Sequence, residues 1–306
     1  MSEKTYLVID GSNLAHRAFQ VASLEFKGVG VEVCRIGISS LRALLQQFTP
    51  SQVFVVWDYG RDSQRLTLYP SYKKADKEKS EEEKEKITEY FRQVAEFEKF
   101  IGMSGIAQFK VKGREADDII YSLLAHKIVP EGEIIVVSAD QDMLQLFSSF
   151  EQIKIYQPIK KIIITKTEAE EEIGIPISWW VKYRALAGDS SDNIPGIKGI
   201  GPKKAKKLVD YIRGAGERPQ DKQSVSFLES ESEKKDWERW QEIVRFILVP
   251  KDEILAGEIP AETNCRRMVD SVFAFCKERG FSWICNQFEE FIQPFILHCR
   301  QQKKEG

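Results

Sequence analysis

Acidic side chains end several of the most hydrophobic runs in this chain, and their spacing suggests metal chemistry. The acids that follow such runs directly are Asp10, Asp58, Asp140 and Asp142. Short β-branched runs are typical of buried parallel strands, and ligands bind beyond the carboxyl ends of such strands. We therefore expect these acids to meet at one edge of a sheet. Five more acids in GREADD and LAGDSSDNIPG complete the set: Glu115, Asp117, Asp118, Asp189 and Asp192.

Carboxylates that meet in one place predict bound cations, because like charges raise one another's pKa unless positive charge neutralises them. Oxygen ligands select hard metals, so the expected ions are Mg²⁺ or Mn²⁺ rather than zinc. The alternative for any single Asp at a strand end is a helix cap or a loop residue. Glu115 at a helix start is also a candidate partner of the helix dipole. Asp118 is the weakest candidate of its group, because its neighbour Asp117 could fill the ligand position without it.

The elements that would position these acids alternate along the chain. We expect strands at 5–10, 52–58, 106–111 and 133–138. Helices are expected at 12–19 with Ser12 as N-cap, 36–48, 116–128, 166–174 and 176–189. Apolar stretches at 153–156 and 161–165 indicate a hairpin at the sheet edge. This alternation predicts an α/β fold, with a mostly parallel central sheet, flanking helices and right-handed crossovers.

Two segments depart from that alternation. Residues 59–86 are charged throughout, and we interpret about 60–100 as a projecting segment whose second half, 80–102, is a surface helix. In IPGIKGIGPKKAKKLVDYI, glycines allow a tight turn and Pro202 suits the first helical position, which is the signature of a helix-hairpin-helix. Backbone N–H groups at such a turn bind phosphate. The lysines that accompany the turn and its helix are Lys198, Lys203, Lys204, Lys206 and Lys207.

The rest of the chain is less informative. Residues 214–235 are polar and predict a mobile loop, 236–249 predict a helix, and the part from about 251 looks helical and partly buried. The net charge of −2 is unusual for a nucleic-acid binder, but basic residues can gather on one face. The five cysteines form no CxxC and are expected to be reduced thiols of a cytoplasmic protein. The three histidines share no catalytic motif, and we expect neither export nor a membrane span.

Several motifs in fixed order carry a resemblance to a known family. IDGSN, VVWD, RLTLYPSYK, GREADD, SADQD and GDSSDNIPGIKGIG follow the order of the 5′ nuclease superfamily between about Tyr6 and Tyr211. This family comprises flap endonucleases, 5′–3′ exonucleases of phages and the equivalent domain of bacterial DNA polymerase I. The resemblance implies a PIN-like 5′ nuclease fold with a helical arch and a helix-hairpin-helix subdomain.

The resemblance also implies site residues. Two metal ions would be held by a first acidic group and a second acidic group: Asp10, Asp58, Glu115 and Asp117 with Asp118 beside them, and Asp140, Asp142, Asp189 and Asp192. Lys73 would contact the scissile phosphate, with Arg65 and Tyr72 as further substrate contacts. Where relatives show YKxxR, this chain has Asp76, so Lys74 and Lys77 are substitutes in steering the 5′ strand. A K⁺ ion is expected around Gly196, Ile197 and Ile200.

The function that this resemblance implies is a structure-specific 5′ nuclease of DNA replication and repair, with flap endonuclease, 5′–3′ exonuclease and RNase H-like primer-removing activity. The expected partner is branched or 5′-flap DNA, with an RNA–DNA hybrid as a further substrate, and the expected state is a monomer in bacterial or phage-infected cytoplasm. The domains would be 1–175 for the nuclease core, 176–250 for the helix-hairpin-helix and 251–306 for a C-terminal segment that packs on the core. Alternatives are a nucleic-acid-binding protein that has lost catalysis, a flap endonuclease without exonuclease activity and a PIN-like ribonuclease.

Overall fold

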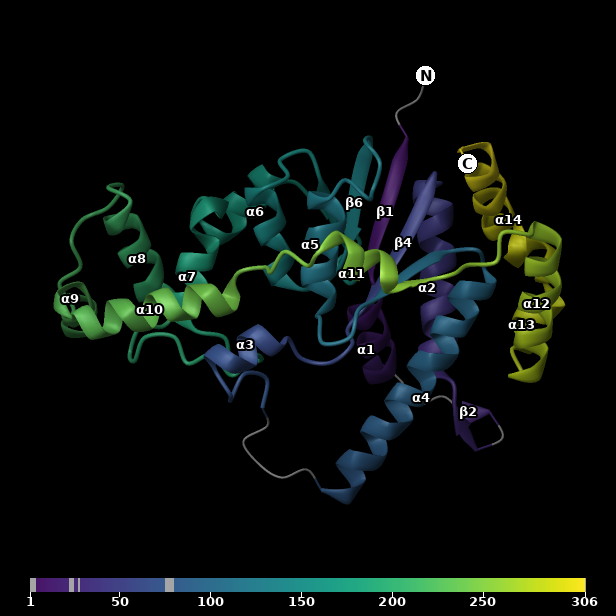
Figure 1. Ribbon diagram of the computed structural model, residues 1–306, viewed down its shortest axis with the longest axis horizontal. Coiled ribbons are helices and arrows are strands. Elements are labelled where there is room, and N and C mark those ends of the chain that lie inside the picture. Colours follow the sequence, from purple (N-terminus) through teal and green to yellow (C-terminus); the bar gives the residue numbers. More distant parts are fainter. Residues whose placement is uncertain (1–3, 22–24, 27, 75–79, 306) are drawn as a thin grey trace.

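A mixed sheet forms the centre of the computed structural model, which describes residues 4–21, 25–26, 28–74 and 80–305 (Figure 1). Within those residues the sheet has seven strands in the order β8-β7-β6-β1-β4-β5-β9. Strands β7, β6, β1, β4 and β5 are parallel, and β8 and β9 are antiparallel at the two edges. The bounds are β1 Thr5–Asp10, β4 Gln52–Trp57, β5 Ala107–Lys110, β6 Glu133–Val137, β7 Lys154–Gln157, β8 Ile162–Ile164 and β9 Glu258–Ile259. The predicted parallel core and edge hairpin are confirmed, while β9 was not anticipated.

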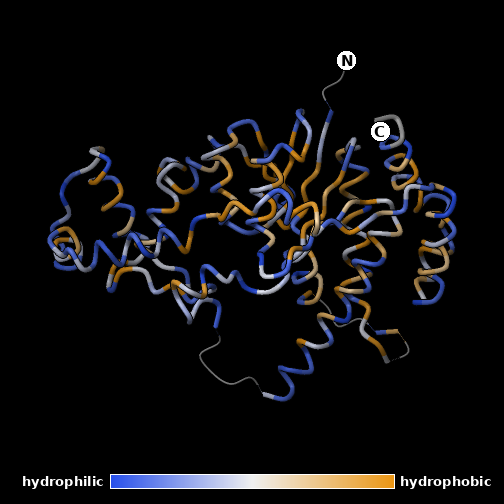
Figure 2. The backbone as a smooth tube through the Cα atoms, in the orientation of Figure 1, coloured by the Kyte–Doolittle hydropathy of each residue, from blue (hydrophilic) through white to orange (hydrophobic). Residues whose placement is uncertain are grey.

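The central strands are hydrophobic without interruption because both faces of the sheet are covered. Leu7 and Ile9 of β1 belong to one buried cluster, whereas Tyr6 and Val8 belong to another on the opposite face. Figure 2 shows the apolar residues gathered along these strands. Asp10 is the last residue of β1, so its carboxylate lies at the carboxyl edge of the sheet.

Helices pack on both faces of the sheet (Figure 1). One face carries α1 Gly11–Val21, α2 Glu32–Phe48, α4 Glu81–Met103, α12 Cys265–Glu278, α13 Ser282–Asn286 and α14 Phe288–Glu305. The other carries α5 Ala116–Ala125, α6 Lys166–Ile173, α11 Lys251–Ala256 and the 3-10 helix η1 Gln141–Ser148. A two-stranded hairpin, β2 Glu25–Phe26 and β3 Val29–Gly30, follows α1. No helix in the described ranges is both long enough and apolar enough to span a bilayer.

The projecting segment is built as predicted in the part that the structure describes. After the short helix α3 Ser63–Leu68, the chain enters α4 through a capping box in which Ser80 and Glu83 satisfy each other's backbone N–H groups. The first buried residue of α4 is Gln93, so the N-terminal half of the helix extends away from the core. Asp76, which departs from the family motif, and Lys77, which was predicted to compensate for it, lie outside the described residues.

A third buried cluster holds the hairpin region together. It joins the 3-10 helix η2 Ile177–Trp179 and the helices α7 Trp180–Ala187, α8 Pro202–Ile212, α9 Lys222–Glu229 and α10 Glu231–Val244. Gly196 sits between α7 and α8 with a φ of +63°, and a Cβ there would lie 2.5 Å from the backbone nitrogen of Gly188. This turn therefore requires glycine, as the sequence pattern predicted.

The prediction of a mobile loop over 214–235 is wrong from residue 222 onward. Asp221 and Ser230 accept hydrogen bonds from backbone N–H groups at the starts of α9 and α10, respectively. Phe227, a single aromatic in a polar stretch, is 1% exposed and packs edge to face on Trp237. Because the stretch is polar on average, the sequence analysis missed the two helix caps, Asp221 and Ser230, and the buried side chain of Phe227. The helix predicted over 236–249 likewise begins at Glu231 and ends at Val244, so 245–249 returns to the sheet without helical structure.

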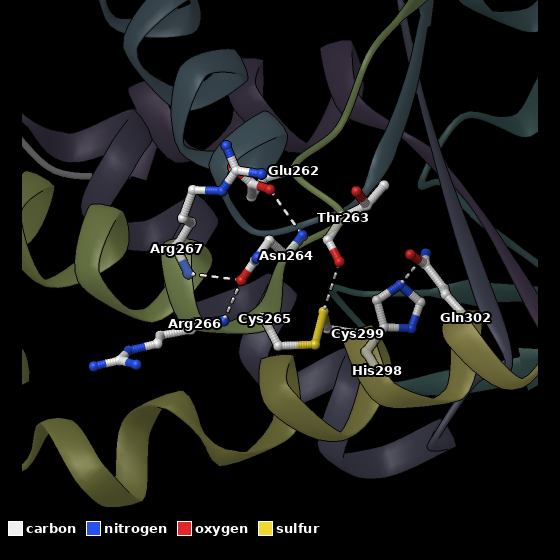
Figure 3. Close-up of a disulfide and its surroundings, with 9 residues drawn as sticks. All are labelled: Glu262, Thr263, Asn264, Cys265, Arg266, Arg267, His298, Cys299 and Gln302. Atoms are coloured by element: carbon white, nitrogen blue, oxygen red, sulfur yellow. Dashed lines mark hydrogen bonds and ion pairs between the residues drawn. A yellow bond between two sulfur atoms is a disulfide. The ribbon is translucent and has the colours of Figure 1, made fainter.

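The expectation that the cysteines are reduced thiols is wrong for one pair. Cys265 on α12 and Cys299 on α14 form a disulfide, with their Cα atoms 6.0 Å apart (Figure 3). Asn264 accepts hydrogen bonds from the backbone N–H groups of Arg266 and Arg267, which fixes the start of α12 beside Cys265. Because 34 positions separate the two cysteines, their spacing in the sequence could not reveal that the two helices pack together. Cys34, Cys276 and Cys285 are free thiols.

Replacing Cys299 with Ala is expected to lower the free energy of unfolding by about 4 kcal/mol, because the disulfide closes a loop of 34 residues in the unfolded chain. Urea unfolding of both proteins with and without dithiothreitol measures this difference. The variant should match the reduced wild-type protein, and Cys285→Ala should keep the full response to reductant. A wild-type protein whose stability does not respond to reductant would show that these thiols are reduced.

Candidate functional site

A cleft of about 230 Å³ opens at the carboxyl edge of the sheet and collects the acids from distant parts of the chain. Asp10 reaches it from the end of β1, Asp58 from the end of β4 and Asp140 from the loop after β6. Glu115 and Asp117 reach it from the start of α5, and Lys73 from the base of the projecting segment. Six lining residues were not predicted from the sequence as site residues: Ser12, Asn13, His16, Tyr90, Ala116 and Met143.

Hydrogen bonds from neighbouring elements fix the first acidic group. Asp10 accepts from the backbone N–H of Asn13 at 2.9 Å and from the hydroxyl of Ser138 at 3.0 Å. Asp10 thus acts as the cap that we predicted for Ser12, whose hydroxyl instead accepts from the backbone N–H of Asp58 at 2.8 Å. The carboxylate of Asp58 accepts from the backbone N–H of Ala116 at 2.7 Å, which joins the end of β4 to the start of α5.

The electrostatics of the first group fit a bound cation. Burial raises the pKa of Asp10 to about 8, and the nearby carboxylate of Asp58 adds to the effect. Burial likewise raises the pKa of Glu115, against the opposing influence of Lys73. Carboxylates whose ionised forms are this unfavourable without positive charge are suited to a hard divalent cation, and their donors are all oxygen.

These pKa values give the metal-free protein an unusual pH dependence. Asp10, with a folded-state pKa of about 8, binds a proton that the unfolded chain releases near its ordinary value of 3.8. The folded state binds more protons in this window, so the free energy of unfolding in EDTA should fall as pH rises from about 5 to about 8. Urea unfolding across that range measures the trend, and Asp10→Asn should flatten it. Stability that rises with pH in EDTA would contradict this assignment.

The second acidic group lies beside the first. Carboxylate oxygens of Asp142, Asp189 and Asp192 lie within 4.8 Å of one another. Asp140 accepts a hydrogen bond from the backbone N–H of Asp142 at 2.8 Å and so connects the second group to the cleft. One oxygen of Asp142, Oδ1, is buried without a hydrogen bond among the described residues, and burial raises the pKa of this carboxyl to about 7. Nε of Arg184 lies 3.3 Å from this oxygen without completing a hydrogen bond, so the donor set is incompletely satisfied and also fits a hard cation.

Lys73 lies between the two groups. Its backbone has a φ of +50°, and its N–H donates to the carbonyl oxygen of Asp192 at 3.0 Å. Its Nζ is 3.1 Å from Glu115 and 3.7 Å from Asp192. Burial acts to lower the pKa of Lys73, but the combined attraction of Glu115, Asp192 and Asp117 helps to outweigh it, and the pKa is raised well above its usual value. The side chain is therefore a permanent cation at the centre of the site.

Arg65 and Tyr72 are buried and do not line the cleft, and their role as substrate contacts stays a prediction. Arg65 is 2% exposed, makes two bonds of 2.5 and 2.8 Å to Asp118, and also donates to the carbonyl oxygen of Ile243. Tyr72 is also 2% exposed, and its hydroxyl donates to Glu115 at 2.8 Å. Both oxygens of Asp118 accept hydrogen bonds from Arg65, and carboxylate oxygens of Glu115, Asp117 and Asp118 lie within 4.8 Å of one another, so Asp118 stays a predicted ligand beside Asp117. Arg65 and Tyr72 both donate hydrogen bonds to Glu115 and so fix the position of its carboxylate.

The lysines of the hairpin fall into two sets. Lys198, Lys203 and Lys207 are exposed, as is Lys74 beside Lys73. Lys204 lies 3.1 Å from Asp221 and donates to the carbonyl oxygen of Gly199, and Lys206 is half-buried. All five stay predicted phosphate contacts, and the three exposed lysines are the most accessible of them.

Comparisons with known proteins agree with this geometry. Residues 5–174 match the model of the 5′–3′ exonuclease N-terminal resolvase-like domain, and residues 175–217 match that of the 5′–3′ exonuclease C-terminal SAM fold. The flap endonuclease Xni of Shewanella loihica is 35% identical over 210 residues, 68% of this chain and 77% of that protein.

Solved structures resemble nearly the whole chain. A T5 5′-exonuclease with bound zinc ions has a TM-score of 0.67 at 18% identity, covering 97% of this chain and 100% of that one. The bacteriophage T5 D15 flap endonuclease in complex with DNA and metal ions has a TM-score of 0.64 at 17% identity, covering 95% and 100%. The fold predicted from the sequence, a mostly parallel sheet of the PIN-like 5′ nuclease type, is confirmed.

Proposed function

This chain belongs to the 5′–3′ exonuclease family, and on that premise we propose that it is a structure-specific 5′ nuclease of DNA replication and repair, with flap endonuclease and 5′–3′ exonuclease activity. It is a metal-dependent phosphodiester hydrolase, as members of this family are. The observation that carries the proposal is the cleft in which acids of four separate segments meet Lys73, with the second acidic group of Asp142, Asp189 and Asp192 beside it.

We assign two Mg²⁺ or Mn²⁺ ions to the site, on the basis of its all-oxygen donors. Asp10, Asp58, Glu115 and Asp117 would hold one ion, and Asp140, Asp142, Asp189 and Asp192 the other. Such ions would supply Lewis-acid contacts to the scissile phosphate and make its attacking water more acidic. The known T5 structures contain zinc or metal ions, and the preference for Mg²⁺ here is inferred from ligand chemistry.

The chain's own residues would orient the substrate in that cleft. Lys73 can donate to a non-bridging phosphate oxygen and stabilise the negative charge that develops there, because its ammonium already lies among the acids. Glu115 holds this ammonium in place, and is itself held by Tyr72 and Arg65. The rings of His16 and Tyr90, 6.1 Å apart and edge to face, form an aromatic wall of the same cleft.

The hairpin would bind the duplex beside the cleft. Lys198, Lys203 and Lys207 are exposed around the turn and on α8, where backbone N–H groups at the helix start can also bind phosphate. A K⁺ ion around Gly196, Ile197 and Ile200 remains part of the proposal, supported by positive φ angles of +63° at Gly196 and +79° at Gly199. This grip reads no base sequence, because its partners are phosphates.

Neutralising Lys203 and Lys207 together is expected to weaken duplex binding to all sequences alike. Each lost phosphate contact should reduce the slope of log affinity against log salt by about 0.9. Binding titrations of a Lys203→Gln/Lys207→Gln variant across a salt series measure this slope, with the exposed Lys277→Gln on α12 as the matched control. An unchanged slope would mean that the duplex is held elsewhere.

The substrate range and assembly are also proposals. Branched or 5′-flap DNA is the proposed substrate, an RNA–DNA hybrid is a further one, and the protein is proposed to act as a monomer. The division into 1–175, 176–250 and 251–306 is supported by the separate buried cluster of the hairpin region. Sedimentation of the protein alone tests the monomer, and limited proteolysis tests the boundaries.

One assay tests the function directly. A labelled 5′-flap duplex, a blunt duplex and an RNA–DNA duplex are incubated with the protein in Mg²⁺ or in EDTA, and products are mapped at nucleotide resolution. We expect cleavage near the flap junction in Mg²⁺ and none in EDTA. Flap cutting without shortening of the blunt duplex would identify an endonuclease without exonuclease activity. Tight flap binding without any cleavage would favour the alternative of a protein that has lost catalysis.

A further inference from the structure

Arg184 fills the part of the second acidic group that a cation would need. It lies on α7, and its guanidinium donates to Oδ2 of Asp189 in the closest of its contacts. Its Nε lies 3.3 Å from Oδ1 of Asp142. The guanidinium carbon also lies 5.7 Å from the ring centre of Trp180, so the side chain is supported from its own helix. A positive charge therefore already sits between two of the three acids that approach within 4.8 Å.

In the first group, Glu115 pairs with Lys73 and Arg65, whereas Asp10 and Asp58 have no such partner among the residues that the structure describes. Asp10 and Asp58 accept hydrogen bonds from backbone N–H groups and the hydroxyl of Ser138. Within the residues that the structure describes, neither Asp10 nor Asp58 forms an ion pair with Lys or Arg. Lys73 lies between the two groups and forms ion pairs with Glu115 of the first and Asp192 of the second. The two groups are thus neutralised differently: Asp10 and Asp58 are left without a cationic partner, while Arg184 lies against Asp142 and Asp189.

The fit between Arg184 and Asp142 is incomplete. Nε of Arg184 and Oδ1 of Asp142 are both buried, and neither makes a hydrogen bond of good geometry with any described residue. The arginine supplies charge but leaves this oxygen unsatisfied. Its side chain is 19% exposed, so it can turn toward water without crossing the core. An imperfect, removable partner of this kind is suited to exchange for a better one.

We propose that Arg184 is an internal counter-cation of the second acidic group, and that it must release Asp142 and Asp189 before a second divalent cation can be held there. The proposal rests on the two-cation function proposed above and adds an order to it. Because Arg184 competes for the same oxygens, the second site binds its ion more weakly than the first and fills after it. Arg184 is a positioning residue in this scheme, since it acts through the carboxylates and not on the substrate.

Direct binding of Mn²⁺ in the absence of DNA tests this. Electron paramagnetic resonance of free Mn²⁺ is recorded in titrations of the wild-type protein, Arg184→Gln, Arg184→Lys and the control Lys182→Gln on the same helix. We expect two classes of site in the wild-type protein. Removing the competing charge in Arg184→Gln should tighten the weaker class about tenfold and change the tighter class by less than about twofold. Lys182→Gln should match the wild-type protein.

Arg184→Lys keeps the charge but loses the two-pronged contact, so its weaker class should fall between the wild-type protein and Arg184→Gln. If Arg184→Gln does not fold, Arg184→Lys still decides, because its weaker class must be tighter than that of the wild-type protein. Thermal unfolding gives a second readout: in EDTA, Arg184→Gln should melt below the wild-type protein, and Mn²⁺ should raise its melting temperature by more.

Two results would overturn the proposal, and they differ in what else they affect. Equal affinity of the weaker class in the wild-type protein and Arg184→Gln would mean that Arg184 does not compete, and the two-cation site would stand. Binding of a single Mn²⁺ ion by both proteins would overturn the proposal together with the two-cation function.

Discussion

Asp58→Asn should lower the single-turnover rate of 5′-flap cleavage at saturating Mg²⁺ by at least about 10³-fold, since metal ions contribute several kcal/mol to charge stabilisation in such reactions. The substitution replaces an anionic oxygen ligand by a neutral amide. It should preserve the fold, because Oδ1 of an asparagine can still accept the 2.7 Å hydrogen bond from the backbone N–H of Ala116. Rapid-quench assays with enzyme in excess over labelled flap duplex measure this rate.

The matched control is Asp270→Asn, which removes an exposed carboxylate on α12 that does not line the cleft. It should leave the rate within about twofold, as surface substitutions usually do. Circular dichroism and thermal unfolding should show both variants folded. An Asp58→Asn protein that is folded and cleaves at the wild-type rate would remove Asp58 from the catalytic site and put the first metal position in doubt.

Lys73→Met should lower the same rate by about 10² to 10³-fold while binding of the flap duplex in Ca²⁺ changes by less than about threefold. Methionine keeps most of the aliphatic stem and removes the ammonium that lies 3.1 Å from Glu115. Glu115 is not left unpaired, because Arg65 at 3.2 Å and the hydroxyl of Tyr72 at 2.8 Å still hold it. The rate loss would therefore report the missing charge on the phosphate.

The exposed Lys277→Met on α12 provides the control for Lys73, since Lys277 lies outside the predicted substrate contacts. Its rate should stay close to that of the wild-type protein. Comparing rate at saturation with affinity separates the two roles that a basic residue can have here. If Lys73→Met weakens binding and leaves the saturated rate unchanged, Lys73 is a contact to the DNA backbone and not part of the chemistry.

The sequence was sufficient for the framework of the site. Asp10 and Asp58 follow runs whose uniform hydrophobicity marks strands buried on both faces, and parallel strands bring their carboxyl ends to one edge. The turn at Gly196 was also predictable, since a backbone conformation with positive φ and no room for a Cβ restricts the residue type. Such features depend on neighbours in the chain, so they leave a local pattern.

Tertiary structure alone decided which charged side chains line the cleft and which are buried behind it. Arg65 and Asp118 are 53 positions apart and neutralise each other in the interior, although both look like surface residues in the sequence. Cys265 and Cys299 meet only because α12 and α14 pack together on the same face. Arg184 meets Asp142 across a similar distance in the chain. The charge of a side chain can be read from the sequence, because it depends on the residue type alone. Its partner depends on how distant elements pack together, and a single sequence does not show that packing.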